Sequence, residues 1–158
     1  MVMPGDVPSR CVTPRPKPLA WVDYIDTGNP AVTAFRRWLV SVPRVVREQA
    51  EGDIVALREL AAAGELDANE STTFEPVHSL PDLFELKWRF RRAGKKLVHV
   101  RQYHAEPSEL PTSLVALHIH VKGLNGSKSE IKRRQDAEMA HARLRFIAGE
   151  RSLWGQSH

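Results

Sequence analysis

Three short segments in the second half of the chain alternate strictly between apolar and polar residues, and this pattern most constrains the fold. The segments span 84–91, 97–103 and 114–122. Side chains two residues apart on a strand point to the same face, so this alternation predicts strands with one face in the core. Turn-forming residues at 92–94 and 106–108 separate the segments. We therefore expect a three-stranded antiparallel meander.

The two faces of this meander differ sharply in chemistry. One face is apolar and carries Phe84, Leu86, Trp88, Phe90, Val98, Val100, Val115, Leu117, Ile119 and Val121. The other, which we call the basic face, carries Glu85, Lys87, Arg89, Arg91, His99, Arg101, Tyr103, Ala116, His118, His120 and Lys122. If this face points to solvent, its cations suit a polyanion, and its histidines and tyrosine suit acid–base chemistry.

Composition limits the chain to one domain and excludes some classes of site. With 158 residues and 42% hydrophobic content, the chain can bury one sizeable core. Residues 1–85 carry a net charge of −5 and residues 86–158 a net charge of +9, so anion binding is expected in the second half. The lone Cys11 excludes an intrachain disulfide framework and a cysteine-cluster zinc site. No apolar run approaches the roughly 20 residues of a membrane span, and the N-terminus lacks the apolar core of a signal peptide, so a cytoplasmic location without a membrane partner is expected.

The first half of the chain predicts a leader, one strand and two helices. Residues 1–18 hold five prolines and predict a disordered leader, and 19–25 predict a short strand. Asn29 and Pro30 form a helix-start sequence, and that helix is expected to run to about Val40. A second helix is expected from Pro43 until Gly64 ends it, which gives a helical hairpin. Residues 65–82 are polar and irregular in pattern.

The last predicted element is a basic helix. Ser127 to Glu130 form a capping-box sequence, and the helix is expected to run to about Ile147. Its core-facing stripe is expected to consist of Ala137, Ala140, Leu144 and Ile147. The fold class is then α+β: a small antiparallel sheet, formed by the N-terminal strand and the meander, packed against the helical hairpin and followed by the basic helix. The domain is expected to span 19–148, with a flexible tail at 149–158.

This order of elements resembles the RelE/ParE toxin superfamily, in particular its phage-derived HigB-like branch. Four local motifs carry the resemblance: an Asp-x-Gly-x-Pro opening at 26–30, a Leu-x-x-Leu-x-x-x-Gly helix end at 57–64, a Leu-hydrophobic-Glu-Leu-basic strand at 83–87, and a hydrophobic-Leu-His strand at 116–123 that leads into a helix. The resemblance covers about residues 20–147. It implies a RelE-like fold and the toxin role in a type II toxin–antitoxin system.

The resemblance also implies an activity and partners. Similar proteins commonly cut messenger RNA on the ribosome, with the RNA's own 2′-hydroxyl as nucleophile, and are neutralised by a cognate antitoxin, often a helix-turn-helix DNA-binding protein. Two departures bear on activity. Gly123 stands where the branch usually has a second lysine, and His120 stands where it usually has an aromatic residue. The usual Arg-x-x-Tyr of the middle strand is also altered, because Val100 precedes Tyr103 at that spacing.

RNA cleavage by this route needs a base, cations around phosphorus and an acid, and the basic face offers candidates for each. His118 and His120 are the expected acid–base pair, because imidazole titrates near neutral pH. Lys122 with Arg89 or Arg101 is expected to stabilise charge, and Tyr103 to stack a base or donate a proton. The expected RNA-binding residues are Lys87, Arg91, His99, Lys128, Lys132 and Arg133.

Several alternatives stay open at this point. The histidines can be polar filler, the arginines can bind RNA without acting in chemistry, and Glu85 is expected to pair with a neighbouring arginine. His118, His120 and His99 also permit a metal site, but the nearby ligand set is poor and we expect neither a metal nor a cofactor. For the whole chain, the alternatives are a non-catalytic ParE-like inhibitor of DNA gyrase and a degenerate nucleic-acid-binding member of the superfamily.

Overall fold

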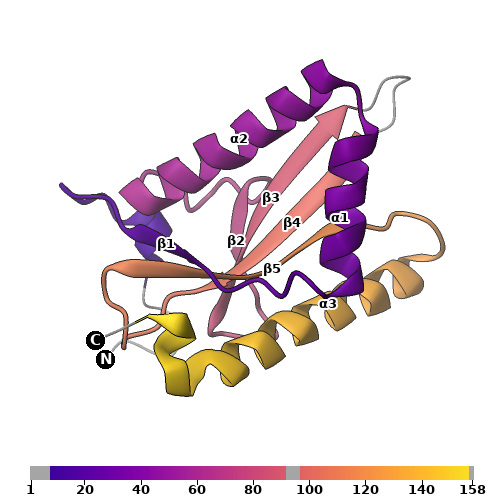
Figure 1. Ribbon diagram of the computed structural model, residues 1–158. Coiled ribbons are helices and arrows are strands. Elements are labelled where there is room, and N and C mark those ends of the chain that lie inside the picture. Colours follow the sequence, from indigo (N-terminus) through magenta and orange to yellow (C-terminus); the bar gives the residue numbers. More distant parts are fainter. Residues whose placement is uncertain (1–7, 92–96, 157–158) are drawn as a thin grey trace.

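The computed structural model describes residues 8–91 and 97–156 as an α+β fold, in which one five-stranded sheet has helices on both faces (Figure 1). In chain order, the elements are the 3₁₀ turn η1 (Arg10–Val12), β1 (Ala20–Asp23), α1 (Pro30–Ser41), α2 (Arg44–Ala63), β2 (Phe74–Pro76), β3 (Leu83–Arg91), β4 (Leu97–Ala105), β5 (Ser113–Lys122), α3 (Lys128–Gly149) and the 3₁₀ turn η2 (Glu150–Gly155). None of the helices in the described ranges is long and apolar enough to cross a membrane.

The sheet has the strand order β1-β5-β4-β3-β2 and is mixed rather than wholly antiparallel. Strands β3, β4 and β5 form the expected antiparallel meander. β1 pairs with β5 in parallel, so the expectation of an antiparallel sheet is wrong at this edge. A parallel neighbour needs a long crossover, and helices α1 and α2 begin the connection that supplies it. β2 adds an antiparallel edge strand within the segment that was expected to be irregular.

A β-bulge interrupts the alternation of β5. Tyr103 pairs with His118, but the next residue of β4, His104, pairs with Ala116, so Leu117 is an extra residue on β5. Val115 and Leu117 consequently pack with Tyr103 in the core beneath α3. The expectation that they share the apolar face with Ile119, and that Ala116 lies on the basic face, is wrong because it assumed uninterrupted alternation.

Two cores lie on opposite faces of the sheet. The first packs α1 and α2 against the apolar face of the meander, with Val32, Phe35, Trp88 and Val100 among its buried side chains. The second packs α3 and η2 against the other face (Figure 1). The basic face is therefore covered over part of its area, in contrast to the expected open platform.

The ends of the helices follow the expected capping chemistry. The Asn29 side chain accepts a hydrogen bond from the backbone N–H of Ala31, and Pro30 occupies the first helical position. Gly64 ends α2 with a φ of 74°, a left-handed conformation that glycine adopts without strain. The Ser127 side chain accepts from the backbone N–H of Glu130 at the start of α3. The close hairpin packing expected between α1 and α2 is not confirmed.

The N-terminal segment packs into the fold from residue 8 onward, which differs from the expected disordered leader. Cys11 is fully buried, and its carbonyl accepts a hydrogen bond from the backbone N–H of Leu66. The Arg10 guanidinium donates to the carbonyls of Pro107, Leu110 and Ser113 beyond β4. Proline content could not indicate these contacts. Residues 1–7 lie outside the described ranges.

The C-terminal segment is also packed where a frayed tail was expected. η2 turns back on α3, and Trp154 is buried there. The Trp154 indole N–H donates a hydrogen bond to the backbone carbonyl of Phe146. The indole also stacks against the Phe146 ring. Residues 157 and 158 lie outside the described ranges.

Candidate functional site

The register of the meander arranges the predicted site residues in three cross-strand rows on the α3 side of the sheet. Each row takes one residue each from β3, β4 and β5. The inner row is Glu85, Tyr103 and His118; the middle row is Lys87, Arg101 and His120; the outer row is Arg89, His99 and Lys122. Sequence alternation therefore identified nine residues that the fold brings together on one surface.

Helix α3 buries the inner row. Glu85, Tyr103 and His118 are each no more than 2% exposed. His118 Nε2 is hydrogen-bonded to the Glu138 carboxylate on α3, so this ring nitrogen is not free to bind another group. The Gln135 amide, also on α3, lies 3.5 Å from Glu85 Oε2. With α3 docked, His118 and Tyr103 cannot touch an external RNA, so the expected direct roles of both residues are not supported.

The middle row combines buried cations with the Glu85 carboxylate. Arg101 Nε lies 3.7 Å and Lys87 Nζ 3.6 Å from Glu85 Oε1, so this carboxylate pairs with its cross-strand neighbours, as expected. Lys87 also donates to Glu75 at 2.6 Å. Arg101 Nε is buried without a hydrogen-bond partner among the described residues. The guanidinium of Arg101 is thus held in place, yet its bonding capacity is not filled.

His120 in the middle row is held as a neutral imidazole. Its Nε2 lies 3.1 Å from the Tyr103 hydroxyl, and its Nδ1 lies 3.3 Å from the carbonyl of Val121. Both contacts are satisfied when Nδ1 carries the proton and Nε2 accepts from the tyrosine. Burial lowers the pKa of His120 to about 4, against an attraction to Glu138. Burial and the nearby Glu85 carboxylate raise the pKa of Tyr103, so the hydroxyl keeps its proton.

The outer row is the part of the basic face that α3 leaves open. Arg89 is exposed, and His99 and Lys122 are half-buried. None of the three forms an ion pair with any residue in the described ranges. Burial lowers the pKa of His99, and the charges of Arg101, Lys122 and Arg89 lower it further. The same positive surroundings act on Lys122, whose pKa is lowered by burial and by Arg101.

This arrangement can bind an anion and move protons next to it. A neutral imidazole at His99 can accept a proton at physiological pH, because its lowered pKa keeps it unprotonated. The ammonium of Lys122 releases a proton more readily than an ordinary lysine does. The exposed Arg89 offers a guanidinium group that matches phosphate oxygens, and the buried Arg101 adds positive charge from the adjacent middle row. The accessible imidazole of the site is thus His99, which the sequence suggested for RNA binding, or as one ligand of a metal site, and not for acid–base chemistry.

The remaining predicted RNA-binding residues lie on α3 and at the end of β3. Lys128, Lys132 and Arg133 are exposed on α3, where they can contact phosphates without sequence preference. Arg91 is the last residue of β3, two positions beyond Arg89 of the outer row. Its side chain lies outside what the structure describes.

Sequence reasoning missed the polar residues of α3 that complete the site. Gln135 and Glu138 face the sheet, whereas the predicted core stripe is exposed: Leu144 is 63% and Ile147 50% accessible. The helix docks partly through polar groups because the sheet surface beneath it is itself polar. A hydrophobic pattern cannot reveal such a face, and a pairing between residues 20 positions apart leaves no local signal.

The three histidines considered for a metal site are not brought together as a ligand set. His118 Nε2 is occupied by Glu138, and the His118 and His120 rings stack on each other at 5.7 Å.

Comparisons of the chain with protein-family models, with curated proteins and with solved structures find no match.

Proposed function

We propose that the chain is an endoribonuclease of the RelE/HigB-like kind, which cleaves messenger RNA on the ribosome and is the toxin of a toxin–antitoxin pair. The observation that carries this proposal is the open outer row, where a neutral histidine lies between an arginine and a lysine that have no acidic partner among the described residues. An anionic substrate supplies the charge that this row lacks, and phosphodiesters match it.

The proposed reaction distributes its proton transfers over the outer row. His99 accepts the proton of a ribose 2′-hydroxyl, and the resulting oxygen attacks the adjacent phosphorus. Arg89 stabilises the negative charge that develops on the phosphoryl oxygens, and the buried Arg101 adds positive potential from the middle row beneath it. Lys122 donates a proton to the departing 5′-oxygen. The products are a 2′,3′-cyclic phosphate and a free 5′-hydroxyl, and exchange with water then removes the proton from His99 and returns one to Lys122.

The roles differ from those expected from sequence. His99 was expected to bind RNA and here accepts a proton, and Lys122 was expected to stabilise charge and here donates one. His118 and His120 act as positioning residues here: His118 binds α3 through Glu138, and His120 holds Tyr103 beneath the row. Their rings shape the floor of the site and do not reach the substrate. The departures at His120 and Gly123 from the usual toxin pattern therefore fall outside the proposed proton-transfer groups.

The test is inducible expression in a bacterial host with mapping of messenger RNA 5′ ends. We expect new ends within translated codons for the wild type, and a loss of at least about 100-fold in His99→Ala and Lys122→Ala, because each removes a proton-transfer group. Arg36→Ala is the matched control, since Arg36 is an exposed cation on α1 on the other face of the sheet. Equal cutting by wild type and both site variants would contradict the proposal.

A protein-binding inhibitor is the second candidate, and one observation favours it. The α3 surface exposes Leu144 and Ile147 beside a groove of about 760 Å³ that also includes Val77, Leu80 and Met139. Such a surface suits another protein, which can be the antitoxin or a target such as gyrase. Toxicity that persists in Lys122→Ala without any RNA cuts would favour this candidate.

A further inference from the structure

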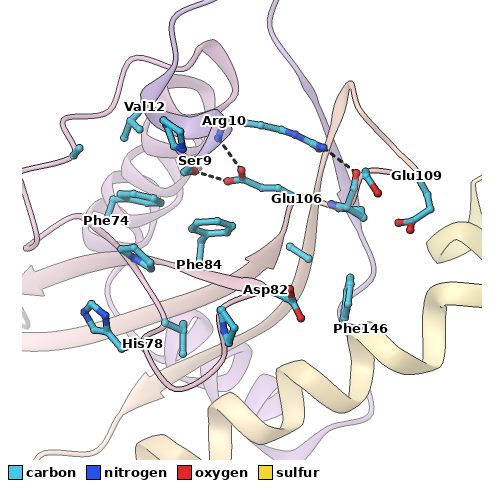
Figure 2. Close-up of a pocket in the computed structure, with 18 residues that line it drawn as sticks. Ser9, Arg10, Val12, Phe74, His78, Asp82, Phe84, Glu106, Glu109 and Phe146 are labelled. Carbon is cyan, nitrogen blue, oxygen red and sulfur yellow. Dashed lines mark hydrogen bonds between the residues drawn. The ribbon is translucent and has the colours of Figure 1, made fainter. Parts of the chain in front are cut away.

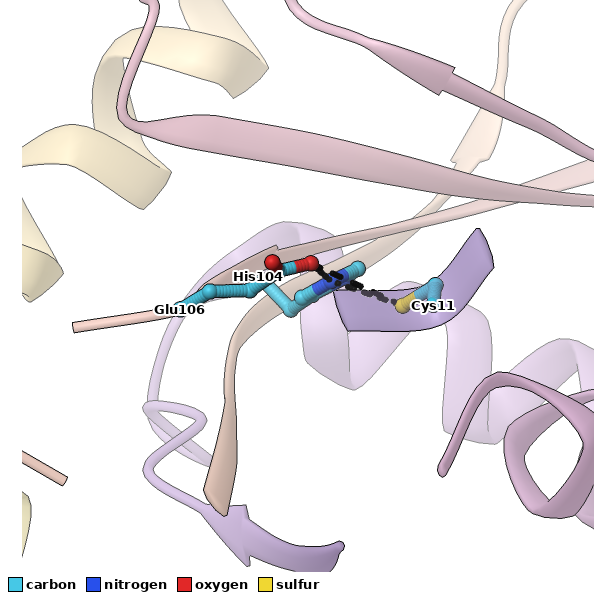
Figure 3. Close-up of side chains that lie close together, drawn as sticks. All are labelled: Cys11, His104 and Glu106. Atoms are coloured by element: carbon cyan, nitrogen blue, oxygen red, sulfur yellow. Dashed lines mark hydrogen bonds and ion pairs between the residues drawn. The ribbon is translucent and has the colours of Figure 1, made fainter. Parts of the chain in front are cut away.

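A sulfur, a nitrogen and an oxygen converge at the end of β4, away from the basic face. Cys11 comes from η1, while His104 and Glu106 come from the end of β4 and the residue after it (Figure 3). Cys11 and His104 are fully buried, and the Glu106 side chain is 7% exposed. This cluster plays no part in the proposed RNA site.

The spacing of the three atoms matches the edges of a metal coordination tetrahedron. Cys11 Sγ lies 3.4 Å from His104 Nε2 and 3.6 Å from Glu106 Oε2, and His104 Nε2 lies 3.1 Å from Glu106 Oε2. Ligands at the usual zinc distances of about 2.0–2.3 Å are separated from one another by about 3.3–3.6 Å. One ion can therefore contact all three atoms with shifts of a few tenths of an ångström.

Charge balance also favours a divalent cation at this place. A thiolate, a carboxylate and a neutral imidazole around a divalent ion sum to zero charge, which is the arrangement that a buried site tolerates. Binding releases the thiol proton to solvent, and no electrons are transferred.

Neighbouring groups fix the ligands in orientation. Glu106 Oε2 accepts from the Ser9 hydroxyl at 2.5 Å, and Glu106 Oε1 accepts from the backbone N–H of Arg10 at 2.7 Å. The His104 ring is held between aromatic neighbours, with the edge of Trp21 at 5.3 Å and the face of Phe84 at 5.5 Å between ring centroids. The hydrogen bonds to Glu106 are typical of the support around a metal ligand, whereas Nδ1 of His104 has no hydrogen-bond partner among the described residues.

A cavity lies beside the Glu106 end of the cluster. Its volume is about 840 Å³, and Ser9, Arg10, Phe84 and Glu106 are among the residues that line it (Figure 2). The carboxylate of Glu106 thus faces the metal position on one side and the cavity on the other. An ion can enter by this path, and a water molecule from the cavity can complete a four-coordinate site.

We propose that Cys11 Sγ, His104 Nε2 and Glu106 Oε2 bind a zinc-class divalent ion, with water from the cavity as the fourth ligand. The mixed sulfur, nitrogen and oxygen donor set suits zinc, and cobalt as its spectroscopic substitute, better than magnesium or calcium. The ion fastens the N-terminal segment to the end of β4. It thereby gives the only cysteine of the chain a structural role.

The first test is metal analysis and cobalt titration of the full-length wild type, purified without chelators. We expect about one zinc per chain and, after zinc removal, a cobalt–thiolate charge-transfer band that saturates at about one equivalent. Because the chain has a single cysteine, such a band assigns Cys11 as a ligand without any variant. No bound zinc together with no thiolate band would overturn the proposal.

Variants then identify the other two ligands. We expect His104→Ala and Glu106→Gln to lower zinc content at least about tenfold, since each removes one of three protein ligands. His78→Ala and Glu109→Gln are matched controls, because these residues line the same cavity but not the cluster, and they should keep full zinc content. Zinc retained in folded His104→Ala and Glu106→Gln would overturn the assignment, and the RNA-cutting assay is independent of either result.

Discussion

Three histidines of the basic face have the same sequence character but different physical states. His118 is bonded to a carboxylate on α3, His120 accepts from a buried tyrosine, and His99 stands among cations at the open end. Their position on one face was predictable from alternation. Their environments were not, because each depends on a partner from a distant part of the chain or on how far α3 extends over the sheet.

The buried His120 makes stability depend on pH. Its pKa is about 4 in the folded chain and 6.5 as the ordinary value, so the unfolded chain binds the proton first as pH falls. The free energy of unfolding should therefore drop between pH 6.5 and about 4, by up to about 1.4 kcal/mol per pH unit through this one group. Above pH 6.5 both states are neutral and the effect vanishes.

Denaturant unfolding at several pH values measures this contribution. His120→Gln should reduce the acid-side slope, whereas His78→Gln, at an exposed position, should leave it unchanged. Identical slopes for wild type and His120→Gln would show that the imidazole is not held neutral by the fold.

The pH dependence of RNA cleavage should report the state of His99. A base must be unprotonated to act, and the pKa of His99 is lowered by burial, Arg101, Lys122 and Arg89. The acid limb of kcat/KM should therefore lie below the ordinary histidine range. Arg89→Ala removes one of the repelling charges, so the limb should move toward higher pH while overall activity falls. A limb that stays in place would exclude His99 as the titrating group.

At the level of elements, the sequence predicted helix boundaries well, but it did not predict how the helices and strands pack against one another. Asn29, Gly64 and Ser127 marked helix boundaries that the structure confirms, because capping depends on residues within a turn. The face that α3 buries was misassigned, because Gln135 and Glu138 bind a polar sheet surface. The parallel pairing of β1 and the bulge at Leu117 were also missed, since both depend on distant register.

Gly52 within α2 and Gly64 at its C-terminal end should respond to alanine in opposite ways. Gly64 has a φ of 74°, and a Cβ there would overlap the carbonyl of Thr13, so Gly64→Ala should cost more than about 1–2 kcal/mol. Gly52 is in the middle of the helix with open space around it, so Gly52→Ala should stabilise by about 0.5–1 kcal/mol. Thermal unfolding of the two variants compares them directly. Equal effects would contradict the packing of the N-terminal segment on the end of α2.

For the whole molecule, the sequence predicted the class of fold and which residues lie together on the basic face. It did not predict which of these residues are exposed to solvent. The meander and the order of helices followed from periodicity, and nine site residues were placed on one surface. That α3 covers two of its rows could not be read from residue patterns. Nor could the contacts of Cys11 with His104 and Glu106, which join residues more than 90 positions apart.

The central claim is that the open row drives attack by a ribose 2′-hydroxyl, and a single-atom change in the substrate tests it most directly. Ribosomes programmed with a short messenger RNA are treated with the purified full-length chain, and the mapped cut site carries either ribose or 2′-deoxyribose. We predict cleavage of the all-ribose message to a 2′,3′-cyclic phosphate and none at the deoxy position. Cleavage of both messages at equal rates, or of neither, would contradict the account.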